Sequence, residues 1–221
     1  MFLSRYIKKC IFAGLYKLSL IKKEEFMTPK RIFDKNVRQF GKKTTLAIMA
    51  VICIGFSLIN CKKDLPTGDY EKLLFDCVDL DDGGTFPLKY TGRGEDVSPE
   101  FILKNLSSKG KTIAIIFDDL HYRSGFNHWI IWNIPANEIV PGNIPEGKKL
   151  SNMGNAQQGI GYGTHKYRGP KPPKGVQHKY QFNIYVLDCE LTINSSSRKN
   201  QLIKAMDGHI IQYGFINGLF E

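Results

Sequence analysis

The chain has 221 residues and a formal net charge of +10. The basic excess lies at the N-terminal end, because residues 1–60 carry 12 basic and 3 acidic side chains. Residues 61–221 carry 19 basic and 18 acidic side chains, which is close to neutrality. Binding to a nucleic-acid backbone needs a clustered positive field, so we expect no nucleic-acid partner. Residues 61–221 are numerous enough for one well-buried domain.

The N-terminal quarter has the pattern of a targeting segment. Residues 27–60 place basic side chains before an apolar run at 46–59, which is followed by Cys61. This combination is typical of a signal peptide for lipid attachment. The run is shorter than the about 20 apolar residues that a transmembrane helix needs. We therefore predict an exported lipoprotein that is anchored through Cys61 to a membrane of a bacterial cell envelope. An uncleaved anchor helix is the alternative, and it would also tether the protein to a membrane.

The flanking sequence sets the other boundaries. Residues 1–26 precede Met27, which begins an ordinary start sequence, so we interpret them as a wrongly assigned N-terminal extension. Residues 61–72 are polar and contain Pro and Gly, which is typical of a tether. Residues 73–221 are expected to form the folded domain.

Strand signals dominate this domain. Short apolar or alternating runs predict strands at 73–78, 85–90, 112–117, 128–134, 179–187 and 209–219. The Gly-, Pro- and Asn-rich region 141–177 is predicted as a long functional loop. One helix is predicted at 198–206, with Ser195–Ser197 as the source of its N-cap and Gly208 as its stop. This order favours a mainly-β fold, an antiparallel β-sandwich with few short helices, one of them near the C-terminus.

The common enzyme signatures do not occur in the sequence. There is no Gly-x-Ser-x-Gly nucleophile elbow, no His-Glu-x-x-His zinc motif and no phosphate loop ending in Gly-Lys-Ser/Thr. The glycine-rich segment 159–163 is not followed by the helix of a nucleotide-binding loop. Cys-x-x-Cys spacing is also absent, so we expect no structural zinc site, no other metal and no cofactor. Outside the cytoplasm, Cys77 and Cys189 could form a disulfide or remain two separate thiols.

Six segments between residues 75 and 220 occur in an order and spacing that match one family. They are Phe86–Thr91, Glu95–Pro99, Asp118-Asp119 with Phe126–Pro135, Tyr167–Pro173, His178–Tyr180 and Ala205–Ile210. The sequence resembles the phosphatidylethanolamine-binding proteins, in particular their bacterial and archaeal branch that is similar to Raf kinase inhibitors. The resemblance implies a Greek-key β-sandwich with a pocket for a small anion, such as the phosphate of a phospholipid headgroup or of a phosphorylated residue.

The resemblance also implies which residues form the pocket. The matching positions are Asp119, His128, Pro173, His178 and Tyr180, with Tyr167 at the rim. Imidazole and phenol groups can hydrogen-bond an anion, and an Asp beside a His fixes its tautomer or its charge. Asp118 competes with Asp119 for the acidic role, and His121 replaces the second acid of the motif. Lys171 stands where many bacterial relatives have Cys.

We therefore predict a non-catalytic binding module for a small anionic ligand, which regulates a protein partner that the sequence does not identify. One alternative is a hydrolase that uses Asp119, His128 and His178 as acid, base or metal ligands. It lacks a nucleophile, because no Ser or Cys of the matched pocket motifs is placed to attack a substrate. The other alternative is a purely structural surface lipoprotein.

Overall fold

The computed structural model describes residues 68–123 and 125–221. The predicted extension, the signal peptide and the lipid attachment at Cys61 lie outside these residues, as does most of the tether. In the described part of the chain, no helix combines the length and the apolar character needed to cross a membrane.

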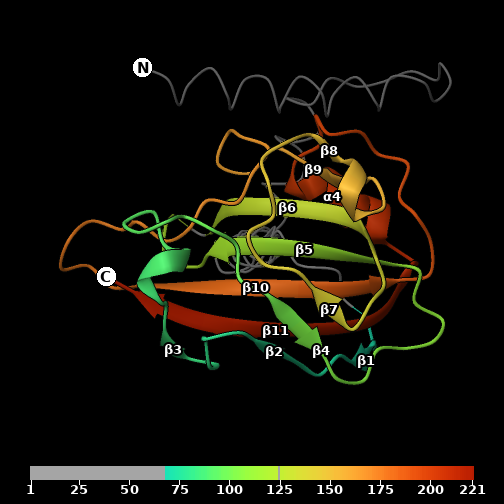
Figure 1. The fold of residues 1–221 in the computed structure, drawn as a ribbon, viewed down its shortest axis with the longest axis horizontal. Coiled ribbons are helices and arrows are strands. Elements are labelled where there is room, and N and C mark those ends of the chain that lie inside the picture. Colours follow the sequence, from blue (N-terminus) through green and yellow to red (C-terminus); the bar gives the residue numbers. More distant parts are fainter. Residues whose placement is uncertain (1–67, 124) are drawn as a thin grey trace, which may run out of the picture. The chain divides into compact units, whose positions relative to one another are not determined.

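Four long strands run side by side through the larger sheet (Figure 1). They are β5 (Thr112–Asp119), β6 (Phe126–Pro135), β10 (His178–Leu187) and β11 (Ile210–Phe220). Four short strands join them: β1 (Glu71–Lys72), β3 (Gly84–Thr85), β8 (Lys149–Leu150) and β9 (Ala156–Gln158). The sheet order is β1-β11-β10-β5-β6-β9-β8, and β3 also pairs with β11. The long strands pair antiparallel, whereas β1 and β3 lie parallel to β11.

A smaller sheet covers one face of the larger one. It contains β2 (Phe75–Cys77), β4 (Phe101–Leu103) and β7 (Ile139–Val140), in the order β2-β4-β7. Phe101 of β4 packs edge-on against Phe182 of β10, with ring centroids 5.1 Å apart. The main hydrophobic core lies between the two sheets. The predicted mainly-β class, with one α-helix near the C-terminus of the described chain, is confirmed.

Side-chain alternation along the central strands explains the two cores. On β10, Tyr180, Phe182 and Ile184 belong to the main core, while Tyr185 and Leu187 belong to a second cluster with helix α4 (Lys199–Met206). Successive residues of a strand point to opposite faces, so both faces of β10 are buried. The same holds for β5, where all eight residues are buried. The uninterrupted apolar run of β5 therefore reflects a strand covered on both sides.

The predicted strand at 85–90 is wrong. Only Gly84–Thr85 pairs with β11, and the chain then enters a 3₁₀ turn, η1 (Leu88–Tyr90). Pro87 directly precedes this turn, and proline has no N–H group to continue a strand ladder.

The predicted loop at 141–177 also contains regular structure. Strands β8 and β9 form a hairpin around the 3₁₀ turn η2 (Ser151–Met153), and β9 pairs with β6. Strands of two or three residues are too short to produce a detectable periodicity, so the sequence pattern missed them.

The helix was predicted correctly but its cap was not. The N-cap residue is Arg198, whose backbone N–H donates to Oε1 of Gln201 at 2.9 Å. Ser197 instead donates its backbone N–H to the carbonyl of Asn194, in the turn that precedes the helix. Cys77 and Cys189 are free thiols, which agrees with the second of the two alternatives left open by the sequence.

Candidate functional site

A cavity of about 270 Å³ lies at one end of the larger sheet. Strand register brings the elements together, because Asp119 at the end of β5 pairs with Tyr180 of β10 on one side and Phe126 of β6 on the other. The lining residues are Asp119, Tyr122, Phe126, His128, Tyr162, Lys171, Pro172, Pro173, His178 and Tyr180. Five of the six principal residues predicted for the pocket therefore lie in one cavity. Their contact with a ligand remains a prediction.

The buried carboxylate of Asp119 organises one wall. Its Oδ2 accepts a hydrogen bond from Nδ1 of His178 at 2.6 Å. Its Oδ1 accepts the backbone N–H groups of His121 and Tyr122 at 2.8 and 3.0 Å. The same side chain thus orients the His178 ring and closes the turn that follows β5. With Nδ1 of His178 engaged, Nε2 is the ring nitrogen left for a ligand.

His128 occupies a second wall in an apolar and aromatic surrounding. Its Nδ1 donates to the carbonyl of Arg168 at 2.9 Å, and the rings of Tyr162 and Tyr180 lie 5.2 and 5.4 Å away. Burial lowers the pKa of His128, and the Arg168 hydrogen bond and nearby carboxylates oppose this shift only in part. A neutral imidazole whose Nδ1 carries the proton has a lone pair on Nε2. Nε2 of His128 can therefore accept a hydrogen bond.

Tyr180 and Lys171 add the donors. Burial raises the pKa of the Tyr180 hydroxyl, and the charge of Asp119 raises it further, so the hydroxyl keeps its proton. Lys171 is exposed at the cavity and brings a positive charge to it. An acceptor, a phenol donor and a cation around a small cavity suit a compact anion that still carries a donor group of its own.

Asp118 and Asp119 point to opposite sides of β5, as neighbouring strand residues do. Asp118 forms an ion pair with Lys199 of α4 at 2.5 Å and accepts a hydrogen bond from Asn127 at 3.0 Å. Asp118 therefore stabilises the helix-covered face, and Asp119 is the acid of the cavity.

Two other predicted residues lie outside the lining. Tyr167 was expected at the rim, but it is only 2% exposed and donates its hydroxyl to the carbonyl of Tyr90 at 2.8 Å. Its ring stacks on Phe117 in the core below. His121 accepts the backbone N–H of Lys179 through Nδ1, and its ring stacks 5.9 Å from that of His178. His121 thus contacts His178, a residue of the cavity lining, and does not itself line the cavity.

Sequence reasoning missed three aromatic residues of the lining, which are Tyr122, Phe126 and Tyr162. Tyr162 lies in the glycine-rich segment 159–163, which packs directly on β6. A Cβ atom at Gly161 would lie 2.7 Å from Cα of Trp129, so this close approach requires glycine. The cluster of glycines was the available signal, because glycine often marks the contact of one backbone with another.

The class of protein follows from this fold and from comparison with known sequences. The family model described as phosphatidylethanolamine-binding protein matches residues 78–221. The chain belongs to this family.

Relatives and solved structures agree with that assignment. A UPF0098 protein of Pyrococcus horikoshii is 36% identical over 181 residues, which cover 80% of this chain and 85% of the relative. A similar fold is found in the crystal structure of CT736 from Chlamydia trachomatis, a homologue of the phosphatidylethanolamine-binding proteins. The TM-score is 0.59 and the sequence identity is 26%. The match covers 68% of this chain and 98% of CT736. Escherichia coli YbcL shares the fold, with a TM-score of 0.60, 23% identity and the same coverage.

Proposed function

We propose that the cavity binds a small phosphate-like anion and that the protein acts as a binding module rather than a catalyst. The observation that carries this proposal is the commitment of both Nδ1 atoms to protein acceptors. His178 contacts Asp119 through Nδ1, and His128 contacts the Arg168 carbonyl in the same way. This leaves two Nε2 atoms, the Tyr180 hydroxyl and Lys171 for one ligand.

The chemistry of these groups restricts the class of ligand that can bind. The Nε2 lone pair of neutral His128 needs a donor, while Tyr180 and Lys171 need acceptors. A hydrogen phosphate has both, and so does a phosphoethanolamine headgroup with its ammonium group. The buried Asp119 carboxylate would repel a bare anion, but its charge is engaged by His178 and by two backbone amides. The name of the family, phosphatidylethanolamine-binding protein, also fits a headgroup of this kind.

The lining supports binding better than hydrolysis. Among the described residues that line the cavity there is no Ser, Thr or Cys side chain to serve as a nucleophile. A hydrolase would have to activate a water molecule with the Asp119–His178 pair or with His128. A regulatory effect on a protein partner would follow if the partner presents such an anionic group at the cavity.

The binding test is a titration of the full chain with inorganic phosphate and, separately, with phosphoethanolamine. Ring signals of His128 and His178 are followed by NMR, and His209, which does not line the cavity, is the internal reference. Saturable shifts at His128 and His178 alone are expected. Absence of shifts at millimolar ligand would reject the anion site. Tighter binding of phosphoethanolamine than of phosphate would identify a headgroup, and equal affinity would identify free phosphate.

We further propose that the protein is exported and anchored by lipid at Cys61, on the basis of the N-terminal sequence pattern. Metabolic labelling with a fatty acid should mark the wild type and the Cys53→Ser control but not Cys61→Ser. Equal labelling of Cys61→Ser would exclude this residue as the attachment point.

A further inference from the structure

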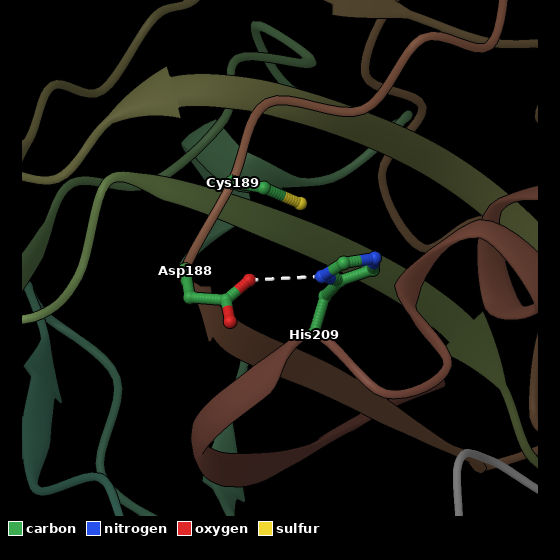
Figure 2. Close-up of side chains that lie close together, drawn as sticks. All are labelled: Asp188, Cys189 and His209. Atoms are coloured by element: carbon green, nitrogen blue, oxygen red, sulfur yellow. Dashed lines mark hydrogen bonds and ion pairs between the residues drawn. The ribbon is translucent and has the colours of Figure 1, made fainter.

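Three side chains with metal-binding groups meet beyond the end of β10 that is opposite to the anion cavity. Figure 2 shows these side chains. They are Asp188, Cys189 and His209, and one ligand atom from each lies within 4.8 Å of the other two. We infer that they form a binding site for a divalent transition metal of the Zn²⁺ type. None of the three lines the anion cavity, so this inference is independent of the proposed function.

The backbone holds the three residues in place. Asp188 and Cys189 directly follow β10, and His209 directly precedes β11. The N–H of Asp188 donates to the carbonyl of His209 at 3.1 Å, which extends the antiparallel pairing of these strands by one bond. The hydroxyl of Thr112 donates to the carbonyl of Cys189 at 2.6 Å. The ligands therefore lie directly beyond the paired ends of β10 and β11, where backbone hydrogen bonds fix their positions.

The side chains are close enough to bind a metal after small rotations. Oδ1 of Asp188 lies 2.9 Å from Nδ1 of His209, and the thiol of Cys189 lies beside this pair (Figure 2). Ligand atoms of a tetrahedral zinc site are roughly 3.5 Å apart, given bond lengths of about 2.0–2.3 Å. The side chains of Asp188 and His209 are 52% and 47% exposed, so they are free to make the remaining adjustment.

The ligand types select the metal. Ca²⁺ and Mg²⁺ prefer a shell of oxygen atoms, and this cluster offers one carboxylate beside a thiol and an imidazole. Thiolate and imidazole ligands favour Zn²⁺ and similar transition metals. Binding would release the thiol proton of Cys189 to solvent, and a water molecule would complete the four-coordinate shell.

A purely structural explanation accounts for less of the arrangement. An exposed Asp–His ion pair contributes little to stability, since such pairs are worth about 0–1 kcal/mol. It also gives no reason for a partly exposed thiol beside the pair. From the sequence we expected no metal site of any kind, but the absence of Cys-x-x-Cys spacing bears only on zinc motifs whose ligands are close together in the chain. A site whose ligands are separated by the whole of α4 has no such local spacing.

The experiment uses the reduced full chain, with Cys10, Cys53 and Cys61 replaced by Ser so that their thiols do not contribute. Zn²⁺ binding is measured by calorimetry, and Co²⁺ binding by absorption, because a Co²⁺–thiolate bond produces a charge-transfer band. We expect one equivalent of Zn²⁺ and a clear cobalt–thiolate band. Cys189→Ser and His209→Gln should each weaken Zn²⁺ binding by about tenfold or more, by analogy with the effect of losing weaker outer contacts of a metal site.

Two controls separate chelation from other effects. Asp207→Asn removes an equally negative, exposed side chain two residues from His209 and should leave the affinity unchanged. His178→Gln removes an imidazole of the anion cavity and should also leave it unchanged. Zn²⁺ should raise the Tm of the parent but not of Cys189→Ser, because a ligand stabilises only a state that binds it. Equal Zn²⁺ affinity in the parent and in Cys189→Ser, or a cobalt spectrum without the thiolate band, would overturn the inference.

Discussion

Oδ2 of Asp119 lies 2.6 Å from Nδ1 of His178, and both side chains are largely buried. These residues are 59 positions apart in the chain and meet because β5 and β10 pair in a register that sets Asp119 opposite Tyr180. The contact fixes which nitrogen of His178 remains available, and it forms the wall on which the proposed anion site depends.

The first prediction concerns this contact. Asp119→Ala should weaken phosphate binding by roughly tenfold or more, because a hydrogen bond to a charged group contributes about 1.5–3 kcal/mol and here it orients His178. Asp118→Ala is the matched control: it removes the neighbouring acid, which faces Lys199 instead of the cavity. Calorimetric titration of both variants measures the difference. Equal losses in the two variants would contradict a specific role for Asp119.

The second prediction concerns the cation of the cavity. Lys171→Met should reduce phosphate affinity by roughly two- to fivefold and lessen its salt dependence, since an exposed ion pair is worth about 0.2–1 kcal/mol and is screened by salt. Lys174→Met removes an exposed lysine three residues away that does not line the cavity, and it should have no effect. Titrations at low and high salt test this. If Lys174→Met reduced the phosphate affinity equally, the affinity would depend on the general positive charge of this surface and not on Lys171 in particular.

The third prediction concerns His128 and pH. Burial lowers its pKa in the folded state below the usual value of 6.5, so the unfolded chain binds a proton that the folded protein does not. The free energy of unfolding should therefore decrease as the pH falls below about 6.5. His128→Gln keeps a side-chain donor but cannot titrate, so its stability should fall less over the same range. Urea denaturation of both proteins between pH 7.5 and pH 5 compares them, and parallel decreases would exclude His128 as a source of the loss.

The fourth prediction concerns the core beneath the cavity. Phe182 is fully buried and stacks on Phe117 with ring centroids 4.1 Å apart. Phe182→Ala should lower the free energy of unfolding by about 3–5 kcal/mol, because it removes buried surface and leaves a void. Phe215→Ala, on the neighbouring strand, alters a side chain that is 51% exposed and should cost less than about 1 kcal/mol. Chemical denaturation measures both free energies of unfolding. A similar decrease in the two variants would mean that the core closes around the missing Phe182 ring.

Local patterns determined much of this protein. The continuous apolar run at 112–117 and the alternation at 179–187 identified β5 and β10, and spacing identified α4, because burial on a strand or helix face repeats with the period of that element. The order of motifs identified the family, which the match over residues 78–221 bears out. Signals failed where elements are only two or three residues long, as at β8 and β9.

Only the tertiary structure decided how the side chains combine. The sequence did not decide whether Asp118 or Asp119 is the acid of the pocket. The pairing of β5 with its neighbours places one of them on each face of the sheet. Tyr167 was expected at the rim of the cavity but is buried in the core. Tyr162 lines the cavity because Gly161 allows its segment to approach β6 closely. The meeting of Cys189 with His209 likewise depends on the pairing of β10 with β11. Periodicity is encoded in neighbouring residues, whereas these contacts join residues far apart in the chain, and their geometry is set by strand register.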